Sequence, residues 1–299
     1  MGLQAAPPCT CSDDSPAAWH VVETANFRLL SYGAQRVDRN TAEACETLRA
    51  TLVKQWLGLA GLEIRWAPKC DIVLHSTEEA YLREVGNAGR NTVASSLINR
   101  KQENILARRI DINATQSDWL STALGHELTH VVLADRFSKK TLPRWIDEGM
   151  AILADPPPKQ SLHRQDLQRA IATRMEFRLS ELLAMADYPA ARRWGAFYGQ
   201  SASLVKFLVD RAGTDRFMEF IDVTLERGYE QGLRQVYQLG IADLERHWHA
   251  QLRAPAPVVA QSASPPILPV GTTSTNLATG PMRNVSLQQP PRVGAFSGR

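Results

Sequence analysis

Two histidines and a glutamate, His126, Glu127 and His130, stand in the pattern His-Glu-Leu-Thr-His in this sequence of 299 residues. Four residues of an α-helix advance the chain by about 400°, so the two imidazoles project from one face, a turn apart. Imidazoles placed in this way can bind one zinc ion at about 2.0–2.1 Å. Glu127 points to the side of the pair, where its carboxylate can act on a water molecule. The spacing therefore predicts a zinc site that carries its own general base.

The residues around this motif favour a helix over 119–132, with Ser117 or Asp118 as the N-cap. Apolar residues recur there at helical spacing: Trp119, Leu120, Ala123, Leu124, Leu128, Val131 and Val132. Gly125 costs the helix about 1 kcal/mol relative to alanine, which indicates close packing beside the metal. The competing interpretation is a core helix that carries two structural histidines.

A catalytic zinc ion needs a third protein ligand and an open fourth position. A second helix is expected from Pro143 to Leu153, because proline suits a first helical turn and Asp155 and three prolines follow. Glu148 lies eighteen residues after His130, enough chain to turn and bring this helix back beside the first. Asp147 is the competing ligand; it lies about 100° away around the helix, and the apolar pattern does not decide between the two.

The segments HELTH and Trp145-Ile146-Asp147-Glu148-Gly149-Met150-Ala151 together resemble the gluzincin metallopeptidases, most closely the peptidase MA-like domain. That family combines HExxH with a Trp-x-x-Glu-Gly-x-Ala helix. The resemblance implies that His126, His130 and Glu148 bind one Zn²⁺ ion and that Glu127 is the general base. Asp147 is then a solvated charge or a partner that orients an imidazole.

A third segment of the resemblance is Tyr198-Gly199-Gln200-Ser201, which precedes an apolar helical stretch. By resemblance, Tyr198 donates a hydrogen bond to the developing oxyanion. The alternative is an aromatic residue that simply packs in the core. His163 is a weaker candidate for the same role, and the remaining histidines lack ligand spacing and are interpreted as structural or surface residues.

The main functional hypothesis is a zinc metallopeptidase that hydrolyses peptide bonds through a zinc-activated water. The alternative is a non-catalytic, zinc-stabilised protein-binding domain, against which the intact Glu127 argues. A deformylase-like hydrolase would need an upstream cysteine ligand, and Cys70 lacks the glycine-rich pattern expected around it. Endo- or exopeptidase action, side-chain specificity and natural substrate are not encoded in any recognisable pattern.

The charge composition and the hydropathy of the chain limit the kinds of binding partner to be expected. Residues 1–253 carry 31 basic and 31 acidic groups, so no electrostatic footprint for nucleic acid is present. No apolar run of about 18 residues predicts a transmembrane helix. The expected partner is a peptide or protein substrate, and oligomeric state is not readable.

Three segments are expected: an irregular stretch over 1–17, a two-lobed zincin-like domain over 18–253, and a disordered tail rich in proline, serine and threonine over 254–299. No signal peptide is visible, so the protein is cytoplasmic or its export signal was removed or never included. Because the family is often exported, we favour an extracytoplasmic location. A disulfide between Cys45 and Cys70 is left open. The four cysteines lack the paired spacings of a structural zinc site, although Cys9-x-Cys11 could help to bind a metal.

The fold expected is α+β and zincin-like: a mixed sheet with helices, the HExxH helix with the metal between two lobes, then a largely helical lobe. Strands are predicted over 20–32, 70–75, 92–99 and 103–113, and helices over 38–57, 77–82, 161–176, 179–186, 194–212, 214–227, 229–238 and 240–252. Residues 92–112 are candidates for a sheet edge that takes an extended substrate by strand addition.

Overall fold

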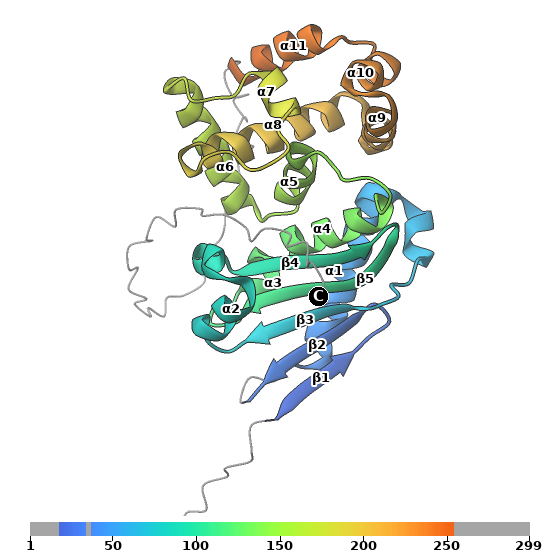
Figure 1. Cartoon of the computed structure of the whole chain (residues 1–299), viewed down its shortest axis with the longest axis vertical. Coiled ribbons are helices and arrows are strands. Elements are labelled where there is room, and N and C mark those ends of the chain that lie inside the picture. Colours follow the sequence, from blue (N-terminus) through green and yellow to red (C-terminus); the bar gives the residue numbers. More distant parts are fainter. Residues whose placement is uncertain (1–17, 34–36, 254–299) are drawn as a thin grey trace, which may run out of the picture. The chain divides into compact units, whose positions relative to one another are not determined.

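A computed structural model describes residues 18–33 and 37–253 of the chain (Figure 1). These residues divide into two compact units. The first contains Ala154–Pro156 and the described residues up to Thr141, and the second contains Leu142–Leu153 and the described residues from Pro157. The predicted irregular segment over 1–17 and the predicted tail over 254–299 lie outside the described residues.

The first unit is built on a mixed five-stranded sheet in the order β1-β2-β3-β5-β4 (Figure 1). Its strands are β1 (Trp19–Glu23), β2 (Phe27–Tyr32), β3 (Cys70–His75), β4 (Ala94–Lys101) and β5 (Asn104–Asn113). The pairs β2/β3 and β3/β5 are parallel, whereas β1/β2 and β4/β5 are antiparallel. Among the described strands, β1 and β4 therefore form the two edges of the sheet.

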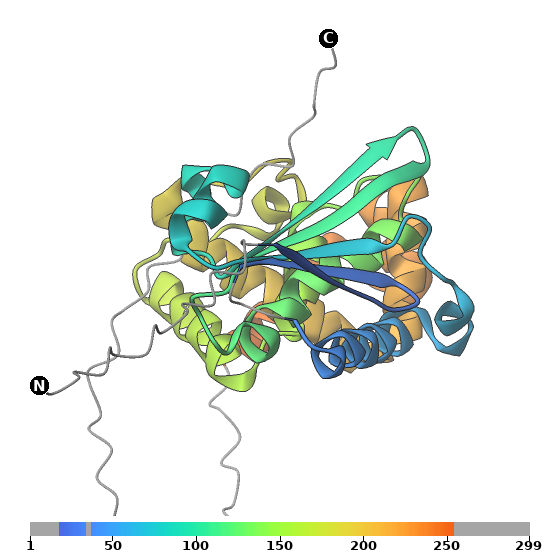
Figure 2. The ribbon, with the colours of Figure 1, turned by 90° about the horizontal axis from the view of Figure 1, so that it is seen from below.

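Helices cover one face of this sheet and form the core of the first unit with it. They are α1 (Arg39–Leu57), α3 (Trp119–Thr122) and α4 (Leu124–Arg136). Helix α2 (Glu78–Val85) and 3-10 turns at Leu59–Glu63 and Asn87–Asn91 complete the unit. Alternate residues of β3, Cys70, Ile72 and Leu74, are buried in the core that α1 and α4 share. Helix α1 lies along one face of the sheet (Figure 2). Helix α2 lies at the end of the sheet where β3 stops (Figure 1).

The strand expected over 20–32 is wrong as one element, because the chain reverses at Thr24–Asn26 and forms the antiparallel pair β1/β2. The reversal is held by Glu46 of α1. Its carboxylate accepts hydrogen bonds from Thr24 Oγ1 and the Asn26 backbone N–H, both at 2.7 Å. The residues of this contact are about twenty positions apart in the sequence, so the local hydrophobic periodicity does not reveal the turn.

The helix expected over 119–132 is also divided. Ala123 has φ −129° and ψ −35°, which separates the short α3 from α4. Asp118 occupies the N-cap position of α3 without a side-chain capping bond. The HExxH residues consequently begin in the first turn of α4 rather than in the middle of a longer helix.

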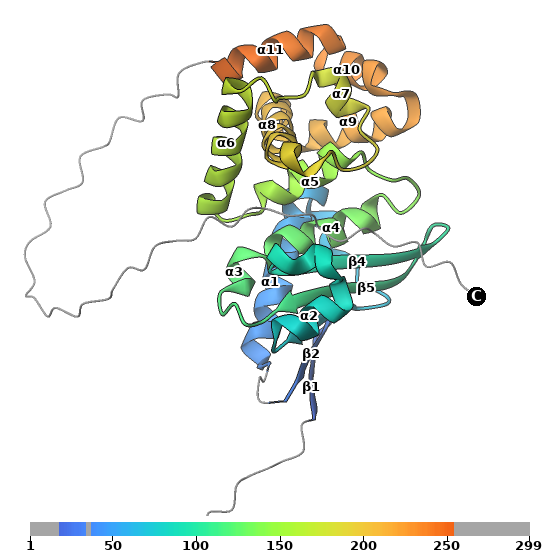
Figure 3. The same cartoon turned by 60° about the vertical axis from the view of Figure 1, so that its left-hand side comes forward.

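The second unit consists of helices. They are α5 (Arg144–Leu153), α6 (Pro157–Ala172), α7 (Leu179–Leu183), α8 (Trp194–Ala212), α9 (Thr214–Arg227), α10 (Tyr229–Tyr237) and α11 (Ile241–Arg253), with a 3-10 turn at Ala191–Arg193. Helix α8 packs against α5, α6 and α9 (Figure 3). Large aromatic side chains, among them Trp145, Phe197 and Trp248, are fully buried in this unit.

The predicted α+β class is confirmed, with the strands preceding a largely helical remainder. The helix predicted over 161–176 is shifted: α6 begins at Pro157, where prolines cost no helical hydrogen bond, and ends at Ala172, shortly before the left-handed Arg174 at φ 56°. No helix in the described part of the chain is both long and apolar enough to cross a membrane.

Gly149 allows the close approach of α5 and α8. A Cβ atom built on Gly149 would lie 2.5 Å from the Ser201 carbonyl oxygen, which is backbone and cannot move aside cheaply. The glycine of the Trp-x-x-Glu-Gly-x-Ala segment is therefore a packing requirement of the second unit.

We expect Gly149→Ala to destabilise the protein by about 1–3 kcal/mol through overpacking, although helix propensity alone would favour alanine by about 1 kcal/mol. Thermal unfolding should show a melting temperature lower by several degrees. Gly240→Ala is the matched control, because a Cβ there would meet its nearest neighbour at 3.4 Å, an ordinary contact. An unchanged melting temperature in Gly149→Ala would contradict the packing argument.

Candidate metal centre and its polar support

Helix α4 separates its polar residues from its apolar ones. Leu128, Val131 and Val132 are buried in the core of the first unit, whereas His126, Glu127 and His130 are partly exposed. The two imidazole rings lie 5.1 Å apart between centroids, edge to face. The predicted spacing thus places both histidines on one side of the helix, with Glu127 in the first turn, where the helix dipole favours a carboxylate.

Two arginines of the sheet hold the C-terminal half of α4. Arg100 donates hydrogen bonds to the carbonyl oxygens of Ala134 and Phe137 at 3.1 and 3.3 Å, satisfying groups that a helix end leaves without partners. Arg108 forms an ion pair with Asp135 and donates to the Pro68 carbonyl at 2.6 Å. These contacts fix α4 along the β4/β5 pair.

Gly125 lies where the backbone of residue 154 passes α4. A Cβ atom on Gly125 would stand 2.9 Å from the Ala154 carbonyl oxygen. The close packing predicted at Gly125 is therefore present. The packed partner is the backbone of Ala154, the residue before Asp155.

Asp155 is a partner of the first histidine. The Nδ1 atom of His126 lies 3.3 Å from Asp155 Oδ2, and the aspartate side chain has no exposed surface. A proton on Nδ1 donated to this carboxylate leaves Nε2 as the lone-pair donor of the ring. This is the usual support for a metal-binding imidazole.

Glu148 lies in α5 of the second unit and is only 2% exposed. The Tyr188 hydroxyl donates a hydrogen bond to its Oε1 atom. Burial, together with the charge of Glu148, raises the pKa of Tyr188 well above its usual range, so the hydroxyl keeps the proton that it donates. Trp145, one turn earlier on α5, is anchored by a 2.9 Å hydrogen bond from its indole Nε1 to the Tyr229 hydroxyl.

One potential ligand atom from each of His126, His130 and Glu148 lies within 4.8 Å of the other two. Two imidazoles and one carboxylate are a donor set suited to a divalent transition metal and typical of catalytic zinc sites. Among the described residues this cluster contains Glu148 and not Asp147, which is half-buried in the same first turns of α5. The side chains present therefore fit a metal ion.

Tyr198 and His163 lie in an aromatic cluster of the second unit. Both are buried, at 7% and 3% exposure, and their ring centroids are 5.9 Å apart. The Tyr188 ring lies 6.4 Å from that of Tyr198 and 5.9 Å from that of Phe197. Tyr198 thus lies beside the residue that donates to Glu148, and its predicted oxyanion role stays a prediction.

Glu127 has a partner on the edge strand β4. Ser96 Oγ donates a hydrogen bond of 2.7 Å to Glu127 Oε2. The serine faces the same side of the sheet as its cross-strand neighbour Ile110, which is fully buried. The carboxylate of the predicted base is therefore held from the sheet, through one of its two oxygens.

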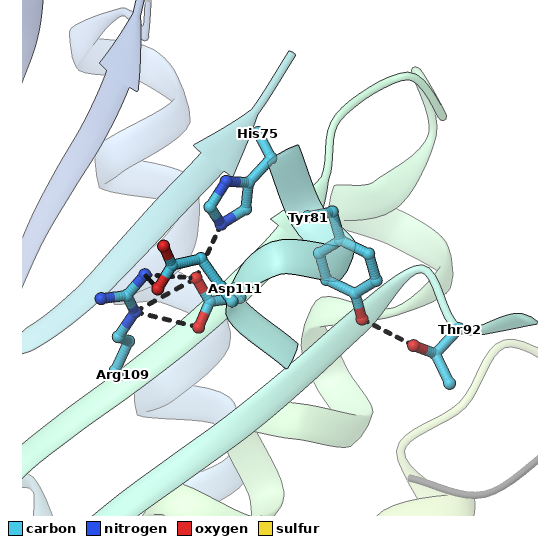
Figure 4. Close-up of polar contacts among 6 residues, drawn as sticks. His75, Tyr81, Thr92, Arg109 and Asp111 are labelled. Carbon is cyan, nitrogen blue, oxygen red and sulfur yellow. Dashed lines mark hydrogen bonds and ion pairs between the residues drawn. The ribbon is translucent and has the colours of Figure 1, made fainter. Parts of the chain in front are cut away.

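His75, interpreted from the sequence as structural, belongs to a polar network on the opposite face of the sheet. Asp111 Oδ1 lies 2.7 Å from His75 Nε2 and 2.7 Å from a guanidinium nitrogen of Arg109. Figure 4 shows Asp111 between the two side chains. Burial alone would raise the pKa of Asp111, but the hydrogen bonds from His75 and Arg109 outweigh it and lower the pKa. Nearby, the Tyr81 hydroxyl lies 2.6 Å from Thr92 Oγ1 (Figure 4). This network joins α2 to the sheet through a 3.1 Å hydrogen bond from Arg109 to Glu84.

Cys45 and Cys70 are free, buried thiols rather than a disulfide. Burial raises the pKa of Cys45 to about 12 and that of Cys70 further still. Cys70 faces the sheet core, which removes the basis for a deformylase-like site. Cys9 and Cys11 lie outside the described residues.

The family model of the peptidase MA superfamily matches residues 98–254, more than half of the chain. The chain belongs to this superfamily, as the two motifs predicted. Membership suggests a peptidase, and hence a hydrolase with a peptide or protein as its substrate. The comparison with curated proteins gave no match.

Sequence reasoning missed three residues that support this centre: Ser96, Asp155 and Tyr188. Their partners lie 31, 29 and 40 residues away along the chain. A lone serine in a strand, an aspartate before prolines and a tyrosine in a loop have no local pattern that marks them. Asp155 was assigned only to the end of a helix.

We expect Tyr188→Phe to weaken metal binding by roughly tenfold, because Glu148 would lose the hydroxyl that orients it. Competition with a chromophoric chelator measures the affinity directly. Tyr229→Phe is the matched control, since it removes another half-buried tyrosine hydroxyl of the same unit, one that is bonded to Trp145. Equal affinities for wild type and Tyr188→Phe would refute the orienting role.

Proposed function

We propose that this protein is a zinc-dependent metallopeptidase that hydrolyses peptide bonds with Glu127 as the general base, and that residues 18–253 form its catalytic domain. The observation that carries the proposal is the grouping of His126, His130 and Glu148 in a chain of the peptidase MA superfamily. Asp155 and Tyr188 add support, because each engages one of these side chains in the manner of a partner that orients a ligand.

Zinc held by the three side chains would lower the pKa of a bound water molecule to about 7 and polarise the substrate carbonyl. Glu127 takes a proton from the attacking water as its oxygen bonds to the carbonyl carbon. It then passes the proton to the amide nitrogen as the C–N bond breaks, which yields a carboxylate and an amine. Both transfers need the Glu127 carboxylate within hydrogen-bond reach of the reacting atoms.

Tyr198 is our candidate for the donor that stabilises the oxyanion. A well-placed donor of this kind contributes roughly 3–4 kcal/mol to the transition state. Its position among the rings beside Tyr188 supports the assignment, and the role is separable from that of Tyr188, which acts on Glu148.

Strand β4 is our candidate for the substrate-binding edge. Its only strand partner in the described sheet is β5, which leaves the other side of β4 without a strand neighbour. An extended peptide could add there through backbone hydrogen bonds. Ser96 of the same strand contacts Glu127, so a peptide on this edge would lie along the strand that carries the partner of the base.

Glu127→Gln should abolish peptide hydrolysis, with a loss of at least about 100-fold in kcat, because the amide cannot accept the water proton. Metal content, measured by inductively coupled plasma mass spectrometry, should stay at the wild-type level. An equally active variant would overturn the base assignment. Zinc bound by a wild-type chain that cleaves no peptide in a proteome-derived library would instead favour the non-catalytic binding domain.

Glu148→Ala and Asp147→Ala distinguish the two candidate third ligands. We expect Glu148→Ala to lose bound zinc and activity together, because one of three ligands is removed, while Asp147→Ala retains zinc. His130→Ala serves as the positive control for zinc loss. Full zinc retention in Glu148→Ala combined with loss in Asp147→Ala would assign the ligand to Asp147.

A further inference from the structure

Ser96 and Glu127 come from different elements of the first unit and meet through one hydrogen bond. The serine lies in the edge strand β4 and the glutamate in the first turn of α4. Ser96 Oγ donates to Glu127 Oε2 at 2.7 Å, and both residues are half-buried. No hydrogen bond to Oε1 is found among the described residues. Ser96 therefore holds one oxygen of the carboxylate, and no described residue donates to the other.

We propose that Ser96 is a positioning residue for Glu127, which it holds in the orientation that general-base catalysis needs. The inference rests on the proposed function, since it presupposes that Glu127 is the base. A glutamate side chain has three rotatable bonds, and an unheld carboxylate on a partly exposed helix face samples several rotamers. Displacement of a reacting group by about 1 Å can cost on the order of 100-fold in rate.

The strand that supplies Ser96 is itself fixed to the same helix. Four residues further along β4, Arg100 donates to the Ala134 and Phe137 carbonyl oxygens at the far end of α4. Strand and helix are thus joined at two points, one at the base and one near the C-terminus of α4. The Ser96 hydroxyl consequently keeps a fixed position relative to α4, from which it can hold the Glu127 carboxylate. Its placement also aligns the base with the strand edge that we propose takes the substrate.

The test compares Ser96→Ala with Ser96→Thr in the zinc-loaded chain of 299 residues. Ser96→Ala should lower kcat by about tenfold with KM changed less than about twofold, because the base is misplaced while binding is intact. Ser96→Thr keeps the hydroxyl and should restore kcat to within about threefold of wild type. Ser31→Ala is the control: it makes the same change in strand β2 of the same sheet, at a hydroxyl with no hydrogen-bond partner among the described residues.

A double-mutant cycle distinguishes this inference from the proposed function. If Ser96 acts through Glu127, Ser96→Ala does not lower further the residual kcat that the Glu127→Gln variant keeps after its loss of at least about 100-fold. A Glu127→Gln variant with wild-type activity overturns the proposed function itself. An inactive Glu127→Gln combined with wild-type kcat in Ser96→Ala overturns only the role of Ser96.

A readout independent of turnover uses the metal-free protein. The drop in melting temperature caused by Ser96→Ala should be smaller in a Glu127→Ala background, because the hydrogen bond is already lost there. Strictly additive shifts would show that the two side chains do not interact in solution and would refute the inference. Equal losses of kcat in Ser96→Thr and Ser96→Ala would do the same, because the hydroxyl would then carry no function.

Discussion

The burial of one face of α4 is the interaction on which the proposed chemistry of the first unit depends. Leu128, Val131 and Val132 pack into the core below the sheet, and this sets the rotation of the helix about its axis. Two imidazoles four residues apart then necessarily face away from the core together. Thr129, which lies between them, is fully buried and satisfies its hydroxyl with a 2.8 Å hydrogen bond to the Gly125 carbonyl oxygen. Packing thus orients the two candidate ligands, whether or not a metal is bound.

Polar partners supply what packing cannot, namely the orientation of each side chain beyond its Cβ atom. Three of the residues central to the proposed chemistry have such a partner: Asp155 for His126, Ser96 for Glu127, and Tyr188 for Glu148. A buried carboxylate such as that of Glu148 loses hydration, and a hydroxyl that donates to it offsets part of that cost. Each hydrogen bond also restricts the rotamers of the side chain that it holds. The same hydrogen bonds therefore contribute to stability and to preorganisation of the site.

Helix spacing and strand alternation were enough to predict the α+β class, the strand at 70–75 and the helices at 194–212 and 214–227, because these signals are local and strongly periodic. The hairpin within 20–32 escaped prediction because Glu46, from a different element, holds its turn. The same holds for the supporting side chains. His126 and His130 could be recognised from their four-residue spacing, whereas Ser96 and Tyr188 acquire meaning only when folding brings distant segments together.

The HExxH motif and the Trp-x-x-Glu-Gly-x-Ala motif contain residues that fix helix packing as well as candidate metal ligands. In the first motif, Leu128 packs in the core. Gly125, the residue before the motif, lets the backbone of Ala154 pass close to α4. In the helix that bears Glu148, Trp145 anchors α5 and Gly149 admits the backbone of α8. A ligand can act only where its helix is held to within a fraction of an ångström. Motifs that combine ligands with glycine and tryptophan at fixed spacing are therefore more specific than their ligands alone, because chance His-Glu patterns lack the residues that would hold them in place.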